Sequence, residues 1–507
     1  MSERLRISWY GTAVFLSSAF LLVLEIVAGR LIAPYVGVSL YTWTSIIGVI
    51  LAGLSLGNWL GGILADRGAG ETAAGITLAL GGLFSLGILF LLTLIAPLIE
   101  ARELSLLSAS FLYVLALFFI PGVLLGIVTP LLTTLALKYD RRTGHIVGRM
   151  HALAALGSIL GTFVTGYWLI QYFGTRGVII ATAIGLFLLA APFLRHAARP
   201  ALPAMLAAGL VLTLLTYRLD GFANPCDNES NYFCIRVIDD SGDHPYGTTR
   251  SLVLDHLMHG TNHATRPDLL LAPYVHLMDE LVLAHFTPER SESLRWFFIG
   301  GGAYTLPRAV RARSPAADVT VAELDPLVTR TSEQQLFLDT TGMRLLHADA
   351  RIALQRQPPA NFDVIVGDAF HDISVPYHLV TREFARLVRT RLAPDGLYLL
   401  NVVDSFPDSR LVKSIMKTLA TEFTHVDVWL DQIPAEPMRL ALVISAGNGP
   451  APPPVLAARH GLERRWMRIT EPLRQTGTPL AQLPLLSDDF VPVERLVSNF
   501  FLGDLGR

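Results

Sequence analysis

The stretch that decides the fold of the polar part of this chain is RWFFIGGGAYTLPRAV, residues 295–310. It begins with an apolar run, continues through three consecutive glycines and ends in a helical pattern near 305–313. An apolar run that is bounded by glycines and followed by a helix is typical of the first unit of a doubly wound parallel sheet. Gly300, Gly301 and Gly302 would let the backbone approach a ligand closely, because they carry no Cβ.

Beyond this stretch, short apolar runs alternate with helical patterns, as parallel α/β sheets require. The predicted strands are 319–322, 344–347, 362–367, 396–402, 425–430 and 439–445, and helices are predicted near 378–391 and 408–421. Acidic residues follow the first three of these strands: Glu323 with Asp325, then Asp349 beside Ala350, then Asp368. Because such sheets bind ligands at the carboxyl ends of their strands, we expect these residues to surround one site.

The class of ligand follows from the glycines and the acidic residue about 20 positions beyond them, a spacing shared by nicotinamide and S-adenosyl sites. A carboxylate there accepts hydrogen bonds from ribose hydroxyls. Thr305 replaces the third glycine of the dinucleotide pattern, which disfavours a dinucleotide. We therefore predict a Rossmann-like, S-adenosylmethionine-binding domain over 291–507. A structural alternative stays open, in which the three strand-end carboxylates Glu323, Asp349 and Asp368 cap helices.

The first part of the chain has a different composition. Residues 1–219 hold 13 Lys and Arg and 7 Asp and Glu, against 40 and 42 in the whole chain. Runs of this apolarity and length can cross a bilayer. Seven spans are predicted, at 9–33, 41–65, 74–98, 105–137, 150–170, 177–194 and 201–218. Residues 1–219 are thus expected to form an α-helical transmembrane bundle in the inner (cell) membrane, with the lipid bilayer as its partner.

The side of the membrane on which the polar part lies is left open. Nine Lys and Arg fall at the N-terminus and in alternate short loops, and two fall in the opposite loops, so the N-terminus is expected inside and the polar part outside. Cys226 and Cys234, the only cysteines, stand eight positions apart just after the last predicted span. A disulfide between them would need an oxidising compartment, whereas reduced thiols and cytoplasmic adenosyl donors would favour the inside.

From about 226 to 445 the chain resembles the spermidine synthases, or polyamine aminopropyltransferases, and as a whole it resembles their membrane-fused relatives. Residues 254–259 (LDHLMH) are similar to the L-D-G-x-x-Q segment of the family's small N-terminal β-region, which we expect over 224–290. Residues 300–308 are similar to its G-G-G-D-G-x-x-x-R motif, and 322–325 to its V-E-I-D motif. Residues 349–350 stand where it has D-G, and 368–372 where it has D-S-T-D.

The resemblance implies transfer of an aminopropyl group from decarboxylated S-adenosylmethionine, a co-substrate and not a tightly bound cofactor, to a putrescine-like amine, with release of 5′-methylthioadenosine. It assigns Asp368 as the base that deprotonates the amine. Glu323 would bind the ribose and Asp349 the adenine, with the glycine run, Asp325 and Ala350 also on the donor side. The acceptor side would comprise Tyr274, His276, His259, His371 and Asp372.

This sequence departs from the family at three of these positions. Ala303 replaces an aspartate that contacts the donor's ammonium, His371 replaces the second aspartate of D-S-T-D, and His259 replaces a glutamine. Losing the two aspartates weakens recognition of a diamine. It also removes a negative charge that would repel the carboxylate of intact S-adenosylmethionine. Two alternatives follow: a transferase that uses intact S-adenosylmethionine, for example for methyl transfer, and a non-catalytic adenosyl-ligand sensor or transporter.

Other partners are not indicated. Six histidines between 244 and 285 fit no compact metal pattern, so no metal is expected. The polar part carries no basic stripe, which argues against nucleic acid, and a homodimer is left open. Residues 464–466 (RRW) are predicted to form a solvated or membrane-facing patch.

Overall fold

The computed structural model describes residues 3–102, 104–140, 142–195, 201–243, 245–370 and 375–498. The chain divides into two compact units, 1–231 and 232–507. The break therefore falls twelve residues beyond Leu219, where the composition of the sequence changes.

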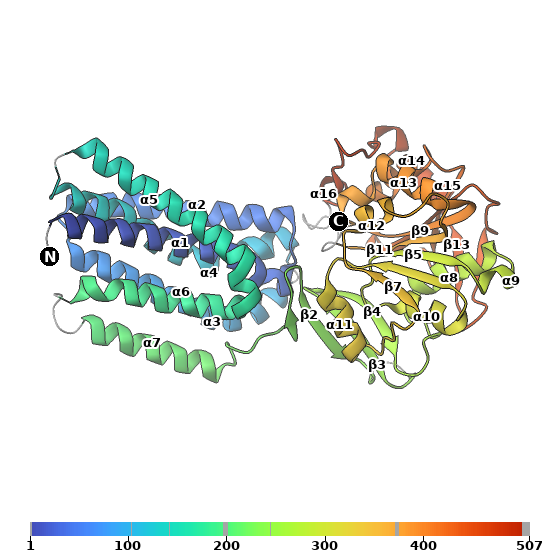
Figure 1. The fold of residues 1–507 in the computed structure, drawn as a ribbon, viewed down its shortest axis with the longest axis horizontal. Coiled ribbons are helices and arrows are strands. Elements are labelled where there is room, and N and C mark those ends of the chain that lie inside the picture. Colours follow the sequence, from blue (N-terminus) through green and yellow to red (C-terminus); the bar gives the residue numbers. More distant parts are fainter. Residues whose placement is uncertain are drawn as a thin grey trace. The chain divides into compact units, whose positions relative to one another are not determined.

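The first unit is helical, and its helices lie side by side in Figure 1. Packing between them relies on glycine: a Cβ on Gly53, Gly57 or Gly61 of the second helix would overlap the backbone of the fourth. The helices are α1 (Glu3–Val36), α2 (Leu40–Asp66), α3 (Glu71–Glu100), α4 (Leu106–Leu137), α5 (Thr143–Val164), the π-helical turn η1 (Thr165–Leu169), α6 (Ile170–Leu194) and α7 (Ala201–Arg218).

Five helices among the described residues are long and apolar enough to cross a membrane. This number counts α5, η1 and α6 as one run, Thr143–Leu194, of 52 residues. The run is broken at Gly174, whose φ of 64° is not helical. The apolar part of α7, Pro203–Arg218, is shorter than a span needs. Seven spans are therefore not confirmed by length and hydropathy.

The second unit begins with a small antiparallel sheet, in which β3 pairs with β2 on one side and β4 on the other. The bounds are β2 (Cys234–Asp239), β3 (Thr249–Leu254) and β4 (Leu257–His263), after a two-residue strand β1 (Asn228–Glu229). Cys226 and Cys234 are both disulfide-bonded and, as the only cysteines, pair with each other.

The main sheet has nine strands in the order β12-β13-β10-β11-β9-β8-β5-β6-β7. The run from β9 to β7 is parallel, and β11 and β10 are antiparallel to their neighbours. The strands are β5 (Arg295–Ile299), β6 (Asp318–Ala322), β7 (Met343–Leu346), β8 (Phe362–Gly367), β9 (Leu392–Phe406), β10 (His425–Leu430), β11 (Met438–Gly447), β12 (Val455–Ala457) and β13 (Arg465–Arg468).

Helices cover both faces of this sheet, with α13 and α14 on one side and α8 and α10 on the other (Figure 1). The central strands are buried along their length, because parallel strands between two helical layers have no solvated face. The helices are α8 (Pro273–His285), α9 (Pro288–Ser291), α10 (Thr305–Arg313), α11 (Pro326–Gln335), α12 (Ala350–Gln355), α13 (Arg382–Arg391), α14 (Arg410–Leu419), α15 (Thr470–Gln475) and α16 (Val493–Leu496), with 3-10 turns Tyr377–Leu379 and Leu480–Gln482. The predicted Rossmann-like arrangement is confirmed.

Candidate active site

The glycine loop after β5 packs against the end of the neighbouring strand β8. Gly300 and Gly302 have φ angles of 93° and 50°, which favour glycine over other residues. A Cβ on Gly300 would lie 2.6 Å from the carbonyl oxygen of Asp368. The loop and the first residue after β8 are therefore held together at the carboxyl edge of the sheet, as the sequence predicted.

Glu323, at the end of β6, is tied to this loop. Its Oε2 accepts hydrogen bonds from the backbone N–H groups of Gly301 (2.8 Å) and Gly302 (3.2 Å), and its Oε1 accepts one from Asp325 N–H (2.9 Å). Only 7% of Glu323 is exposed, and burial raises the pKa of its carboxyl group against these hydrogen bonds. Backbone donors thus hold this carboxylate against the glycine loop at the carboxyl edge of the sheet.

Asp325 and Asp349 cap helices in this structure. Asp325 Oδ1 accepts from Leu327 N–H at the start of α11, and Asp349 Oδ1 accepts from Ile352 N–H at the start of α12. The second oxygen of Asp349 lies 2.8 Å from Nε2 of His378, which sequence reasoning did not select. Of the three strand-end carboxylates in the capping alternative, Glu323, Asp349 and Asp368, the structure shows a helix-capping hydrogen bond for Asp349. Ala350 is the buried first residue of α12.

Among the described residues, the hydrogen-bond donors to Asp368 are neutral. Tyr274 Oη donates to Oδ2 (3.3 Å) and Asn401 Nδ2 donates to Oδ1 (2.9 Å). Burial raises the pKa of Asp368 to about 6, and the two hydrogen bonds offset this only in part. Burial and the nearby carboxylate also raise the pKa of Tyr274, so its phenol stays protonated and donates. Asn401 belongs to no motif of the sequence, and nothing in its local pattern could have identified it.

Tyr274 lines two cavities. The smaller is lined by His259, Gly300, Gly301, Ala303 and Asp368 among others. Burial lowers the pKa of His259 to about 4, so this side chain is neutral. The larger cavity has a volume of about 720 Å³, and its wall is mostly apolar and aromatic, with two carboxylates. It lies where β10 ends and β11 begins, and it is lined in part by Leu277, Trp429, Asp431, Glu436, Met438 and Trp466.

His276 does not join this site, contrary to the sequence prediction. Two residues along a helix turn by about 200°, so Tyr274 and His276 point from opposite faces of α8. His276 is fully buried against the rings of Trp466 and His460, with centroid distances of 5.0 and 5.2 Å. The predicted residues His371 and Asp372 lie outside the described part of the chain. Trp466 is 1% exposed in β13, so the prediction of a solvated patch at 464–466 is wrong for this residue.

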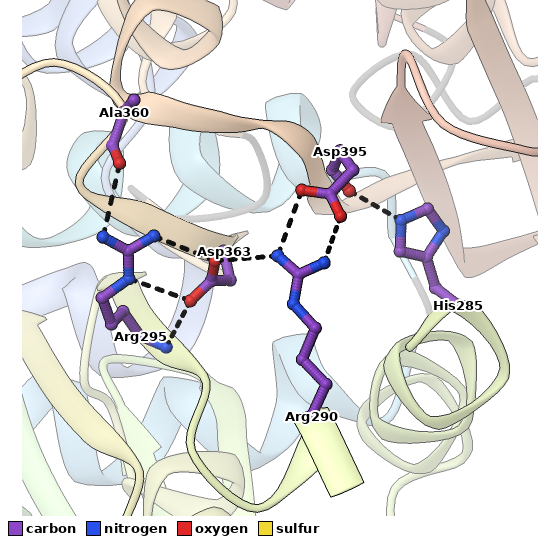
Figure 2. Close-up of polar contacts among 6 residues, drawn as sticks. All are labelled: His285, Arg290, Arg295, Ala360, Asp363 and Asp395. Carbon is purple, nitrogen blue, oxygen red and sulfur yellow. Dashed lines mark hydrogen bonds and ion pairs between the residues drawn. The ribbon is translucent and has the colours of Figure 1, made fainter. Parts of the chain in front are cut away.

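The amino edge of the same sheet carries a different set of charges (Figure 2). Asp363, near the start of β8, accepts from Arg295 Nε and Arg295 N–H at 3.0 and 2.9 Å, and from Arg290 at 3.3 Å. Asp395 also binds Arg290, and its backbone carbonyl lies 2.8 Å from His285 Nε2. Burial alone would raise the pKa of Asp363, but the arginines lower it.

The sequence of the chain is similar to those of several known proteins. No family model matches the chain. The polyamine aminopropyltransferase of Vibrio vulnificus is 29% identical over 142 residues, which cover 27% of this chain and 45% of that protein. The chain resembles polyamine aminopropyltransferases. It spans about half the length of those it matches.

Two further relatives widen the comparison. The N-terminal histidine N-methyltransferase of Emericella nidulans is 30% identical over 145 residues, which cover 27% of this chain and 25% of that protein. A probable spermidine synthase of Corynebacterium glutamicum, known from its crystal structure, is 21% identical over 51% of this chain and 98% of its own, with a TM-score of 0.41. The sequence matches to polyamine aminopropyltransferases and to a methyltransferase support a transferase.

Proposed function

We propose that this protein is a membrane-bound aminopropyltransferase that uses decarboxylated S-adenosylmethionine and an amine acceptor. The observation that carries the proposal is the setting of Asp368. It lies at the end of β8 against the glycine loop, with a tyrosine and an asparagine as its hydrogen-bond donors and a pKa raised to about 6. A carboxylate with a pKa just below neutrality is ionised at pH 7 and is still basic enough to accept a proton from an ammonium group.

The proposed reaction is a single displacement. After the acceptor ammonium gives a proton to Asp368, its nitrogen lone pair attacks the methylene carbon beside the sulfonium. The carbon–sulfur bond breaks, its electrons stay on sulfur, and 5′-methylthioadenosine leaves as a neutral thioether. Asp368 then returns its proton to solvent. Tyr274 orients the carboxylate by its hydrogen bond, and because it lines both cavities, an acceptor bound in the larger cavity would approach Asp368 past its ring.

The donor is assigned to the side of the glycine loop. Glu323 would receive the ribose hydroxyls, and the second oxygen of Asp349, now bonded to His378, would face the adenine. Gly300, Gly301 and Gly302 leave room for the donor to lie against the backbone. The departure from the family on the donor side is Ala303, at the position that would face the donor's aminopropyl ammonium. Ala303 is buried and carries no charge.

Ala303 supports a second candidate, transfer from intact S-adenosylmethionine. A family aspartate at this position would repel the carboxylate of the intact donor, and alanine does not. The match to a histidine N-methyltransferase fits the same candidate. Both reactions use the adenosyl site and the base, and they differ in the group that leaves sulfur.

The test is a product assay on the full-length protein in detergent. We expect 5′-methylthioadenosine and an aminopropylated amine from decarboxylated S-adenosylmethionine with at least one of a panel of amines. Absence of methylthioadenosine with every amine, despite donor binding, would contradict the proposal, and products from the intact donor would establish the second candidate. Ligand-dependent flux without any product would instead establish the sensor or transporter.

The proposed enzyme is membrane-bound because five helices of the same chain are long and apolar enough to cross a bilayer. With the N-terminus inside by the lysine and arginine bias, an odd number of crossings places segment 226–234 on the outer side, and the Cys226–Cys234 disulfide favours the same side. Six crossings, with α7 outside the bilayer, would place the segment inside. In intact cells, an impermeant maleimide should label this segment only after an impermeant reductant is added. Labelling that requires cell lysis would place the segment in the cytoplasm and contradict this orientation.

A further inference from the structure

A buried cluster of ionisable side chains lies behind the wall of the larger cavity and outside the proposed reaction site. It consists of His276, Asp279 and Glu280 on α8, and His460 from the segment between β12 and β13. The three residues from α8 are at most 1% exposed. The mechanism proposed above uses none of them.

In the absence of a metal, the ring nitrogens of His276 are the buried polar atoms of this cluster whose lack of hydrogen bonds needs an explanation. Neither ring nitrogen has a hydrogen-bond partner among the described residues, and the side chain is completely buried. Its Nε2 points to Glu280 Oε1 at 3.6 Å, beyond hydrogen-bond distance. Buried polar atoms without partners are rare in folded proteins, and an ion that occupies the site is one of the ordinary explanations.

The spacing of the ligand atoms fits a small tetrahedral cation. His276 Nε2 and His460 Nδ1 lie 3.6 and 3.0 Å from Glu280 Oε1, and all three atoms lie within 4.8 Å of one another. Ligands about 2.0–2.1 Å from Zn²⁺ in a tetrahedron stand about 3.3 Å apart. His276 and Glu280 are four residues apart on one helix face, so α8 presents both to the same point.

The outer side of the cluster also has the arrangement of a metal site. His460 Nε2, the nitrogen that faces away from Glu280, lies 3.0 Å from Asp279 Oδ2. Asp279 is held in turn by both terminal nitrogens of Arg313. Histidine ligands of metals usually donate their second ring N–H to a carboxylate, which fixes the ring's tautomer and orientation. Gly461 adds no side chain here, and a Cβ on it would lie 3.8 Å from His276 Nε2.

We propose that His276 Nε2, His460 Nδ1 and Glu280 Oε1 bind one Zn²⁺ ion, with Asp279 and Arg313 as the supporting pair. Two imidazoles and one carboxylate form a ligand set that zinc takes in proteins. The ion would connect α8 to the segment before β13, whose Trp466 packs on the His276 ring and lines the larger cavity. In this position the ion would hold α8 and the segment before β13 together at the cavity wall. The proposed site replaces the expectation from the sequence that the chain has no metal site.

The competing account is an ion-pair network without metal, in which a protonated His460 bridges Asp279 and Glu280. This account satisfies His460 and both carboxylates, and it leaves both nitrogens of His276 without partners. The two accounts differ in one measurable respect: only the zinc site makes His276 necessary for metal binding.

The test uses tag-free, full-length protein purified in detergent without chelators. Elemental analysis should find about one zinc per chain. After chelation, Co²⁺ should bind with the same stoichiometry and give the intense visible d–d bands of a tetrahedral site. Absence of zinc together with absence of saturable Co²⁺ bands would overturn the proposal without any variant.

Variants assign the ligands. His276→Ala and His460→Gln should each abolish the Co²⁺ bands, and the exposed His425→Ala is the matched control that should keep them. His460→Gln retains an amide that can hydrogen-bond to Asp279, so it serves if His276→Ala fails to fold. Bands that persist in both ligand variants would place the metal elsewhere and contradict the assignment.

Discussion

The two ends of strand β8 carry aspartates that lie five positions apart and have opposite surroundings. Asp363, near its start, is bound by Arg290 and Arg295, and its pKa is lowered. Asp368, just past its end, is bound by Tyr274 and Asn401, and burial raises its pKa to about 6. Asp363 is buried and Asp368 is partly buried, and their hydrogen-bond partners differ in charge. A carboxylate that meets arginines stabilises the fold, and one that meets only neutral donors is available for proton transfer.

The comparison predicts its largest effect in turnover. Asp368→Asn should lower the rate of methylthioadenosine formation by about 10²–10⁴-fold, the usual contribution of a positioned base. Asp395→Asn, at the amino edge, is the control and should change the rate by less than a few-fold. The measurement is single-turnover product formation in detergent. Equal rates for Asp368→Asn and the wild type would remove the base from the mechanism.

The second effect is on stability at the amino edge. Asp363→Asn should lower the free energy of unfolding by about 2–4 kcal/mol, because it leaves two arginines without their shared carboxylate. Asp395→Asn, whose carboxylate is 46% exposed, should cost no more than about 1 kcal/mol. Denaturant unfolding of the full chain near pH 7 checks both values. Since the folded pKa of Asp363 is lowered, its contribution should disappear only as the pH falls below about 4.

The third effect is an increase in the free energy of unfolding, where the second was a decrease. Asp368 has a folded pKa of about 6, above the ordinary value of 3.8, so the folded protein loses stability as the pH rises through this range. Asp368→Asn should therefore raise the free energy of unfolding by about 1–2 kcal/mol at pH 7 and leave it nearly unchanged at pH 4. Destabilisation at pH 7 would show that the carboxylate is a structural group like Asp363.

The smallest effect tests the hydrogen bond of Tyr274. Tyr274→Phe removes a donor that lowers the pKa of Asp368, so the acid limb of the pH–rate profile should move upward by a few tenths of a unit to about one unit. The exposed Tyr377→Phe is the control and should leave the limb in place. An unchanged limb in Tyr274→Phe would exclude the proposed orienting role.

The alternation of apolar runs and helical patterns was sufficient to predict the sheet, because a buried parallel strand has few other interpretations. Glu323 and Asp368 were found because strand ends meet at one edge. Asn401 was missed because a mid-strand asparagine has no pattern of its own. His276 was assigned to the wrong place because it lies two residues beyond Tyr274 on α8, so its side chain points from the opposite face of the helix. The cluster behind it depends on His460, which lies far along the chain and shares no spacing with α8.

The central claim is that Asp368 serves as the base because its hydrogen-bond donors in the described part of the chain, Tyr274 and Asn401, are neutral. It is tested most directly by the pH dependence of single-turnover methylthioadenosine formation between pH 4.5 and 8.5. The account predicts an acid limb with an apparent pKa near 6, because protonated Asp368 cannot accept the proton of the acceptor ammonium. The same limb should be absent from the residual activity of Asp368→Asn. A limb near 4, or one that persists in Asp368→Asn, would contradict the account.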